Sequence, residues 1–181
     1  MPSETAQVDG RLLGDWIAKN EDRIHFSAKD AHWMQVTITP KISDATTHPS
    51  MVNRNPETYD LYCTTLGVQT FLNVRIAGKD TQGRPSTGYV FYRYKVAPDQ
   101  TLHSWIMSAD ETADAIRAGE LKGTIHQDAH PLMAGNPPHP DVNVHLTDSS
   151  ENLVKFITRK GALDLFGDEG EPLTRVATKG D

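Results

Sequence analysis

The chain has 181 residues, of which 37% are hydrophobic and 23% charged, and its formal net charge is -6 at pH 7. A chain of this length buries roughly 70% of the surface that its unfolded form exposes, so it needs no disulfide or metal to fold. Its lysine and arginine residues are dispersed, which argues against nucleic acid as a partner, because phosphates are bound by clustered basic side chains. With a mean hydropathy of -0.52 and no long apolar run, no transmembrane segment is expected.

The first nine residues are small and polar. We expect a flexible tail over residues 1–9, followed by a single domain over residues 10–181. The segment holds no basic stretch followed by an apolar one, so it is not a secretory signal. An alternative is that a signal was removed and that this tail tethers the domain behind a lipidated cysteine.

Strands follow from the alternation of apolar and polar residues, which is strict from Trp33 to Thr39. Further strands are expected at residues 22–27, 59–65, 68–76, 89–96 and 101–107. Gly67 lies in a tight hairpin, and most connections are short. This order predicts an antiparallel up-and-down meander. Cys63, the single cysteine, has no base or second ligand beside it and is expected to be a small buried hydrophobe.

Two capping boxes predict helices, because a side chain at the first position bonds the amide three residues on. Ser108 to Glu111 begins a helix that runs to about Ala118, and Asp148 to Glu151 begins another that ends at Gly161. Short strands are expected at residues 123–127, 142–146 and 172–176. About eight strands with two short helices predict one mainly β domain, closed into a barrel because closure removes exposed strand edges.

An early Gly-x-Trp, here Gly14-Asp15-Trp16, followed by such a meander resembles the lipocalin and calycin barrels. The resemblance implies a single antiparallel lipocalin-like up-and-down barrel. In it Trp16 plugs the closed end and Arg175, from LTR near the C-terminus, stacks on the indole. Gly14, Trp16 and Arg175 are then residues of structural closure.

The layout is also similar to that of small bacterial lipocalin-like proteins, many of them envelope lipoproteins. The matching fragments are LLGDW, FLNV, GYVFYRY, LHSWIMSADE, LTDSSENLVKFI and LTR. The resemblance implies a location in the bacterial envelope or periplasm, with the cytoplasm as the alternative. It implies no particular cargo, because the second and third lipocalin signature regions are not recognisable and a capped helix precedes the last strand.

Histidines suggest a metal site at His126 and His130, whose spacing would place both imidazoles on one face of a helix. Prolines at 131, 137, 138 and 140 argue against such a helix, so we predict a solvated loop with no metal and keep these two as weak candidates. No sequence motif indicates a cofactor or a catalytic residue.

The strand at 89–96 has two aromatic faces. With Tyr89, Phe91 and Arg93 inside, the barrel would suit an anionic amphiphile; with Val90, Tyr92 and Tyr94 inside, it would have a packed core. The alternation does not decide between them. His103 and Trp105 share a face of the next strand, which points either into the barrel or outward.

The leading hypothesis is a non-enzymatic binding protein for a small apolar or amphipathic ligand. An anionic ligand is included in this hypothesis, because Arg93 would pair with it. Its candidate binding residues are Tyr89, Phe91, Arg93, His103 and Trp105. The alternative is an envelope protein-protein interaction or structural module with a packed barrel and an exposed apolar patch near residues 131–133. A third hypothesis is a barrel enzyme or metal-binding protein.

Overall fold

The computed structural model describes residues 6–41, 55–79, 85–128, 141–160 and 162–176. The chain divides into two compact units. Unit 1 comprises Met1–Ile106 and Asp168–Asp181, and unit 2 comprises Met107–Gly167. Strand makes up 51% of the structure, so the prediction of a mainly β protein is confirmed.

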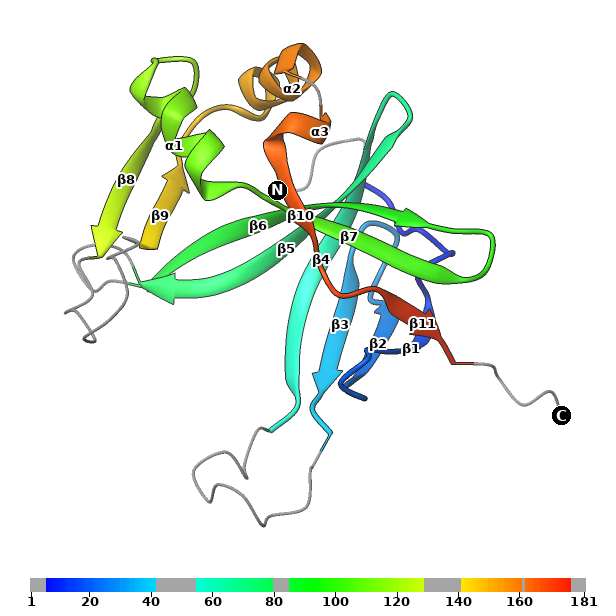
Figure 1. The fold of residues 1–181 in the computed structure, drawn as a ribbon. Coiled ribbons are helices and arrows are strands. Elements are labelled where there is room, and N and C mark those ends of the chain that lie inside the picture. Colours follow the sequence, from blue (N-terminus) through cyan, green and yellow to red (C-terminus); the bar gives the residue numbers. More distant parts are fainter. Residues whose placement is uncertain (1–5, 42–54, 80–84, 129–140, 161, 177–181) are drawn as a thin grey trace, which may run out of the picture. The chain divides into compact units, whose positions relative to one another are not determined.

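Unit 1 is a closed antiparallel barrel of eight strands, with the fold expected of a lipocalin-like protein (Figure 1). Its strands are β1 Gly14–Ile17, β2 Arg23–Ala28, β3 Met34–Thr39, β4 Glu57–Leu66, β5 Gln69–Lys79, β6 Pro85–Val96, β7 Thr101–Met107 and β11 Leu173–Arg175. Strands β1 to β7 pair in chain order, and β11 pairs with both β7 and β1 to close the ring. An extra strand, β10 (Phe166–Glu169), also pairs with β7.

The membership of the barrel differs from the expected one. The segments at 123–127 and 142–146, counted among its strands, instead pair with each other in a separate two-stranded sheet. The remaining barrel strand is β1, which the sequence indicates only as a turn and an aromatic plug. With four residues, β1 is too short to show an alternating pattern.

The barrel core consists of the inward-facing side chains of successive strands. The buried members are Leu12, Trp16, Ile24, Phe26, Met34, Val36, Leu61, Cys63, Leu72, Tyr94 and Leu102. The expectation that Cys63 is a buried residue of a strand is confirmed. The hairpin at Gly67 is also present, with φ +61° at the glycine and Leu66 opposite Gln69.

Residues 6–9 of the expected tail lie against the barrel. Ala6 is only 2% exposed, and Gln7 forms backbone hydrogen bonds in both directions with Cys63. The Asp9 carboxylate accepts a hydrogen bond from the Tyr94 hydroxyl at 2.6 Å. The described part of this segment is therefore packed on unit 1 rather than free.

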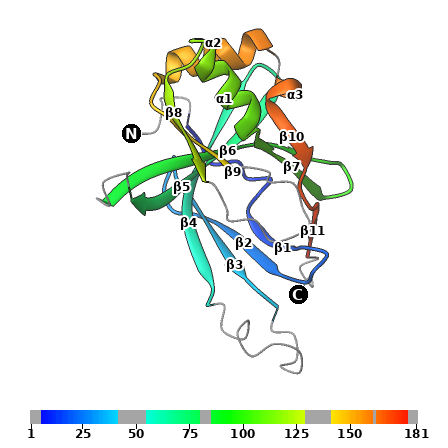
Figure 2. The same ribbon diagram turned by 60° about the vertical axis from the view of Figure 1, so that its left-hand side comes forward.

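Unit 2 is a small α/β unit in which helix α1 packs on a β-hairpin (Figure 2). Its elements are α1 Ala109–Arg117, β8 Gly123–Asp128, β9 Asp141–Leu146, α2 Ser150–Lys160 and α3 Ala162–Leu165. No helix within the described ranges is long and apolar enough to cross a membrane.

The two predicted helix starts are present, one of them shifted. Ser108 is the N-cap of α1, and its hydroxyl accepts a hydrogen bond from the Glu111 amide at 3.3 Å. In α2 the capping contact runs from the Asn152 amide to the Ser149 hydroxyl, one residue later than expected. The Asp148 carboxylate instead accepts hydrogen bonds from the backbone amides of Lys122 and Ser149.

Candidate functional site

The structure decides which face of β6 lines the barrel. Tyr92 and Tyr94 belong to or pack against the core cluster. Because successive side chains of a strand point to opposite faces, the neighbouring positions face outward. The three residues predicted for ligand binding on this strand share that outer face: Tyr89, Phe91 and Arg93.

The two candidates on β7 share the same outer face. His103 lies opposite Lys95 of β6, and Trp105 lies opposite Arg93. Their neighbour Leu102 is buried in the core, as the alternation requires. All five predicted binding residues thus lie on one outer face of unit 1, and the arrangement that places them inside the barrel is not the one observed.

Arg93 stacks on Trp105 of the adjacent strand. The guanidinium carbon lies 3.8 Å from the centre of the indole ring, a close cation–π contact. Arg93 Nε is buried and has no hydrogen-bond partner among the described residues. Burial lowers the pKa of Arg93, while the negative charge of Glu169 acts in the opposite direction.

His103 adds an imidazole next to Trp105 on the same strand. The two rings are stacked, with centroids 6.2 Å apart and planes inclined by 20°. His103 Nδ1 lies 2.5 Å from Glu169 Oε1, where an ionised carboxylate can only accept the proton. We call these four residues, Arg93, Trp105, His103 and Glu169, the Arg93 cluster.

Aromatic side chains extend along the outer face away from this cluster. The Tyr62 ring meets the Tyr89 ring at 5.8 Å and the Trp33 ring at 5.2 Å, both edge to face. Burial raises the pKa of Tyr62. Phe91 lies between Tyr89 and Arg93 on the same face of β6, and all four rings are partly buried. We call Trp33, Tyr62, Tyr89 and Phe91 the aromatic strip.

A buried amide lies on the same outer face as the strip. Asn73 of β5 is 4% exposed, and its Nδ2 donates to the Tyr62 carbonyl oxygen at 3.2 Å and to Thr64 Oγ1 at 3.1 Å. These bonds tie β5 to the adjacent β4, and Asn73 lies between Tyr62 and Phe91 in the strand register. The buried amide nitrogen is thereby satisfied within the sheet.

Sequence reasoning missed three residues of this surface. Tyr62 and Trp33 could have been found, because the same alternation that defines β3 and β4 places them opposite buried neighbours. Glu169 could not have been found from the sequence, because the four residues of β10 show no alternation of apolar and polar side chains. Its pairing with β7 brings it to His103 from far along the chain.

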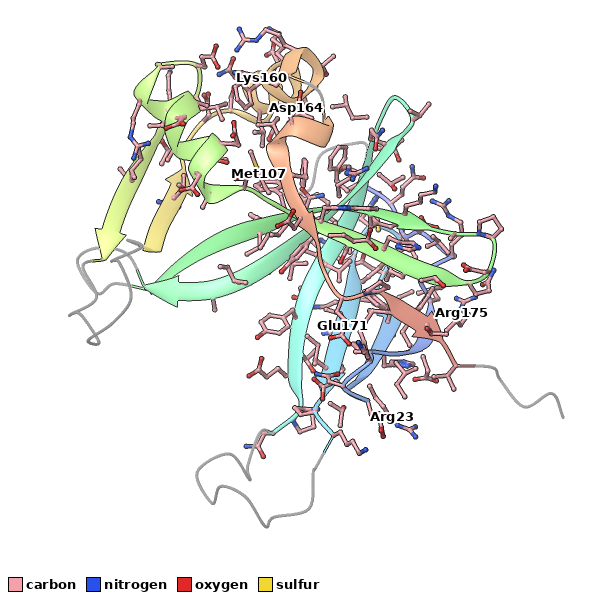
Figure 3. All side chains as sticks on the ribbon, in the orientation of Figure 1. Arg23, Met107, Lys160, Asp164, Glu171 and Arg175 are labelled. Atoms are coloured by element: carbon pink, nitrogen blue, oxygen red, sulfur yellow. The ribbon has the colours of Figure 1, made fainter. Side chains whose placement is uncertain are left out.

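The predicted closure residues lie together on β1 and β11. Trp16 is fully buried opposite Arg175, whose guanidinium carbon is 5.0 Å from the indole centre. Gly14 has φ +114°, a backbone conformation that L-residues other than glycine rarely adopt. Figure 3 shows Arg175 on β11, with Glu171 on the segment that precedes it. These residues contact one another and the backbone, as a structural role requires.

The histidine candidates for a metal are only partly described. His126 lies on strand β8 opposite Asn143, so the helical spacing considered for it does not occur there. His130 and the expected apolar patch at residues 131–133 lie outside the described residues. Within those that are described, no three His, Cys, Asp or Glu side chains gather to hold a metal ion.

No protein-family model, curated protein or solved structure matches this chain, so the candidate site stands on its geometry.

Proposed function

We propose that the protein is a non-catalytic binding protein for a small amphipathic ligand with an anionic group. The ligand lies on the outer face of β4 to β7. Its anionic group pairs with Arg93, and its apolar part lies along the aromatic strip. This keeps the binding residues that the sequence indicates and moves them from the barrel interior to its outer face.

The observation that carries the proposal is the buried Nε of Arg93 without a partner. A buried donor left unpaired costs roughly 1 to 3 kcal/mol, so it is seldom kept without an acceptor. The cation–π contact with Trp105 uses none of the hydrogen-bonding capacity of the guanidinium, so its N–H groups can bind a carboxylate, sulfonate or phosphate.

The aromatic strip supports the amphipathic character of the ligand. Tyr89 lies four residues from Arg93 on β6, a distance of roughly 13 Å along a strand. Partly exposed rings on the outer face of a sheet, where polar residues are usual, mark a surface that binds apolar groups. A charged group at one end and rings along the rest fit a molecule with a head and a tail.

Calorimetric titration with octyl sulfonate tests the proposal, with octanol as the uncharged ligand of equal chain length. We expect octyl sulfonate to bind more tightly, and Arg93→Gln to weaken it at least about tenfold, the effect of losing a charged hydrogen bond. Arg23→Gln is the matched control, because Arg23 is an exposed arginine on β2, a strand outside the proposed surface. Equal binding by the wild type and Arg93→Gln would refute the assignment.

A second candidate function is an interaction module with a solid barrel. It is favoured by the packed interior, in which Trp16, Met34 and Leu61 are all fully buried. Such a module would take up neither octyl sulfonate nor octanol, so the same titration separates the two functions.

We also propose that the chain is a lipocalin-like protein of the bacterial envelope, held there by a lipid anchor in its precursor. The closed barrel and the contact of Arg175 with Trp16 support the resemblance from which this follows. Fractionation of the cells that make the protein tests the location.

A further inference from the structure

We propose that ligand binding at the Arg93 cluster is controlled by pH, because protonation of His103 neutralises Glu169 and leaves the charge of Arg93 to the anionic ligand. The inference rests on the proposed function and adds the regulation of that same site.

The geometry places one carboxylate in contact with His103, and its charge also acts on Arg93. Glu169 Oε1 is 2.5 Å from His103 Nδ1, and the side chains are 39% and 29% exposed, so solvent and protons reach both. His103 and Arg93 both pack on the same indole, and a charge at either position is felt by an anion bound on Trp105.

The charge of the cluster therefore changes when the imidazole takes up a proton. With His103 neutral, Arg93 and Glu169 cancel, and a bound anion meets no net charge. With His103 protonated, the cluster carries one net positive charge and Glu169 is held by the imidazolium. Imidazole side chains change charge between about pH 5 and 8, so anion binding should strengthen as the pH falls through that range.

Three other charged groups lie near His103 along the chain or in the strand register: Lys95, Asp99 and Asp168. Lys95 lies opposite His103 on β6, and Asp99 lies in the turn that leads into β7. Hydrogen bonds from Thr101 lower the pKa of Asp99, so this carboxylate stays ionised. Asp168 precedes Glu169 on β10. These groups add a constant background, and His103 alone supplies the change.

The test is the affinity for octyl sulfonate at pH 8 and pH 5.5, since a sulfonate stays ionised at both. We expect binding to be about three- to tenfold tighter at pH 5.5, the effect of one added, partly screened charge. His103→Gln should bind equally at both values. Glu169→Gln should bind more tightly than the wild type at pH 8, because the competing carboxylate is gone.

His25→Gln is the matched control. His25 Nδ1 also lies 2.8 Å from a carboxylate, that of Asp15, on strands away from the cluster. This variant should keep the full pH dependence. Binding that is equal at both pH values in the wild type would overturn only the pH control, as would pH dependence that survives in His103→Gln. Absence of binding at both values would overturn the proposed function as well.

Discussion

Arg175 joins three parts of the barrel end through one guanidinium group. Its Nη2 donates to the carbonyl oxygens of Leu13 at 2.5 Å and Arg11 at 3.0 Å. Its Nη1 donates to the side-chain oxygen Oε1 of Gln100 at 3.3 Å. The indole of Trp16 lies under it, with Nε1 donating to the Leu12 carbonyl oxygen at 2.7 Å. A cation at this position satisfies carbonyls that no neighbouring strand reaches.

Replacing Arg175 should therefore destabilise the barrel. We expect Arg175→Gln to lower the free energy of unfolding by roughly 1 to 3 kcal/mol, because it removes the cation–π contact and the donor to two carbonyls. Urea denaturation measures the change. Arg159→Gln is the control: its guanidinium also lies over a ring, that of Phe156 at 5.7 Å, but its side chain is 62% exposed. A loss as large in the control would contradict the role of Arg175.

Prediction at the residue scale depended on which face of a strand is buried. The pairing of Trp16 with Arg175 could be predicted because a known family supplied it. The orientation of β6 could not, since Tyr92 and Tyr94 on one face are as aromatic as Tyr89 and Phe91 on the other. Only closure of the barrel decides which pair is buried.

The elements of unit 2 fit closely where α1 meets β8. A Cβ atom on Gly123 would lie 2.6 Å from Ile116 Cδ1 and 2.7 Å from the His145 carbonyl oxygen. The glycine is thus required by contact and not by its own backbone conformation. At this point the Ile116 side chain of the helix packs directly on the backbone of the hairpin.

Gly123→Ala should destabilise unit 2 by roughly 1 to 3 kcal/mol, because the backbone of β9 cannot yield as a flexible side chain does. The change is measured by thermal unfolding followed by circular dichroism. Gly167→Ala is the control, since its Cβ would meet no atom within 4 Å. The packing argument fails if the two variants melt alike.

Longer elements were predictable, as was the three-residue strand β11, but the other short strands were not. The strands with six or more residues and the two capped helices were expected near their observed bounds. Strands β1 and β10, with four residues each, were missed because long-range pairing holds them. The cap of α2 moved because Asp148, the expected cap, bonds the Lys122 amide instead.

At the scale of the whole molecule, the sequence predicted that the barrel is closed. It did not predict that the chain divides into two compact units. Repeated alternation with short connections leaves few arrangements that hide the strand edges. No change in composition marks residues 107–167, so nothing in the sequence separated this unit from the barrel. The outer-face site could not be predicted as a site, because Glu169 enters it through β10 after the chain has passed through unit 2.

The tryptophans allow a direct test of where a ligand binds, since the three of them report on different places. Trp16 is fully buried in the barrel, Trp105 lies under Arg93, and Trp33 lies at the end of the aromatic strip. Each indole N–H gives one resonance in a proton–nitrogen correlation spectrum, and single Trp→Phe variants assign them.

The decisive measurement is the shift of these resonances during titration with octyl sulfonate. Our account predicts that the Trp105 signal moves with ligand concentration while the Trp16 signal stays in place. A Trp16 signal that moves while Trp105 stays unchanged would place the ligand inside the barrel and contradict the outer-face site.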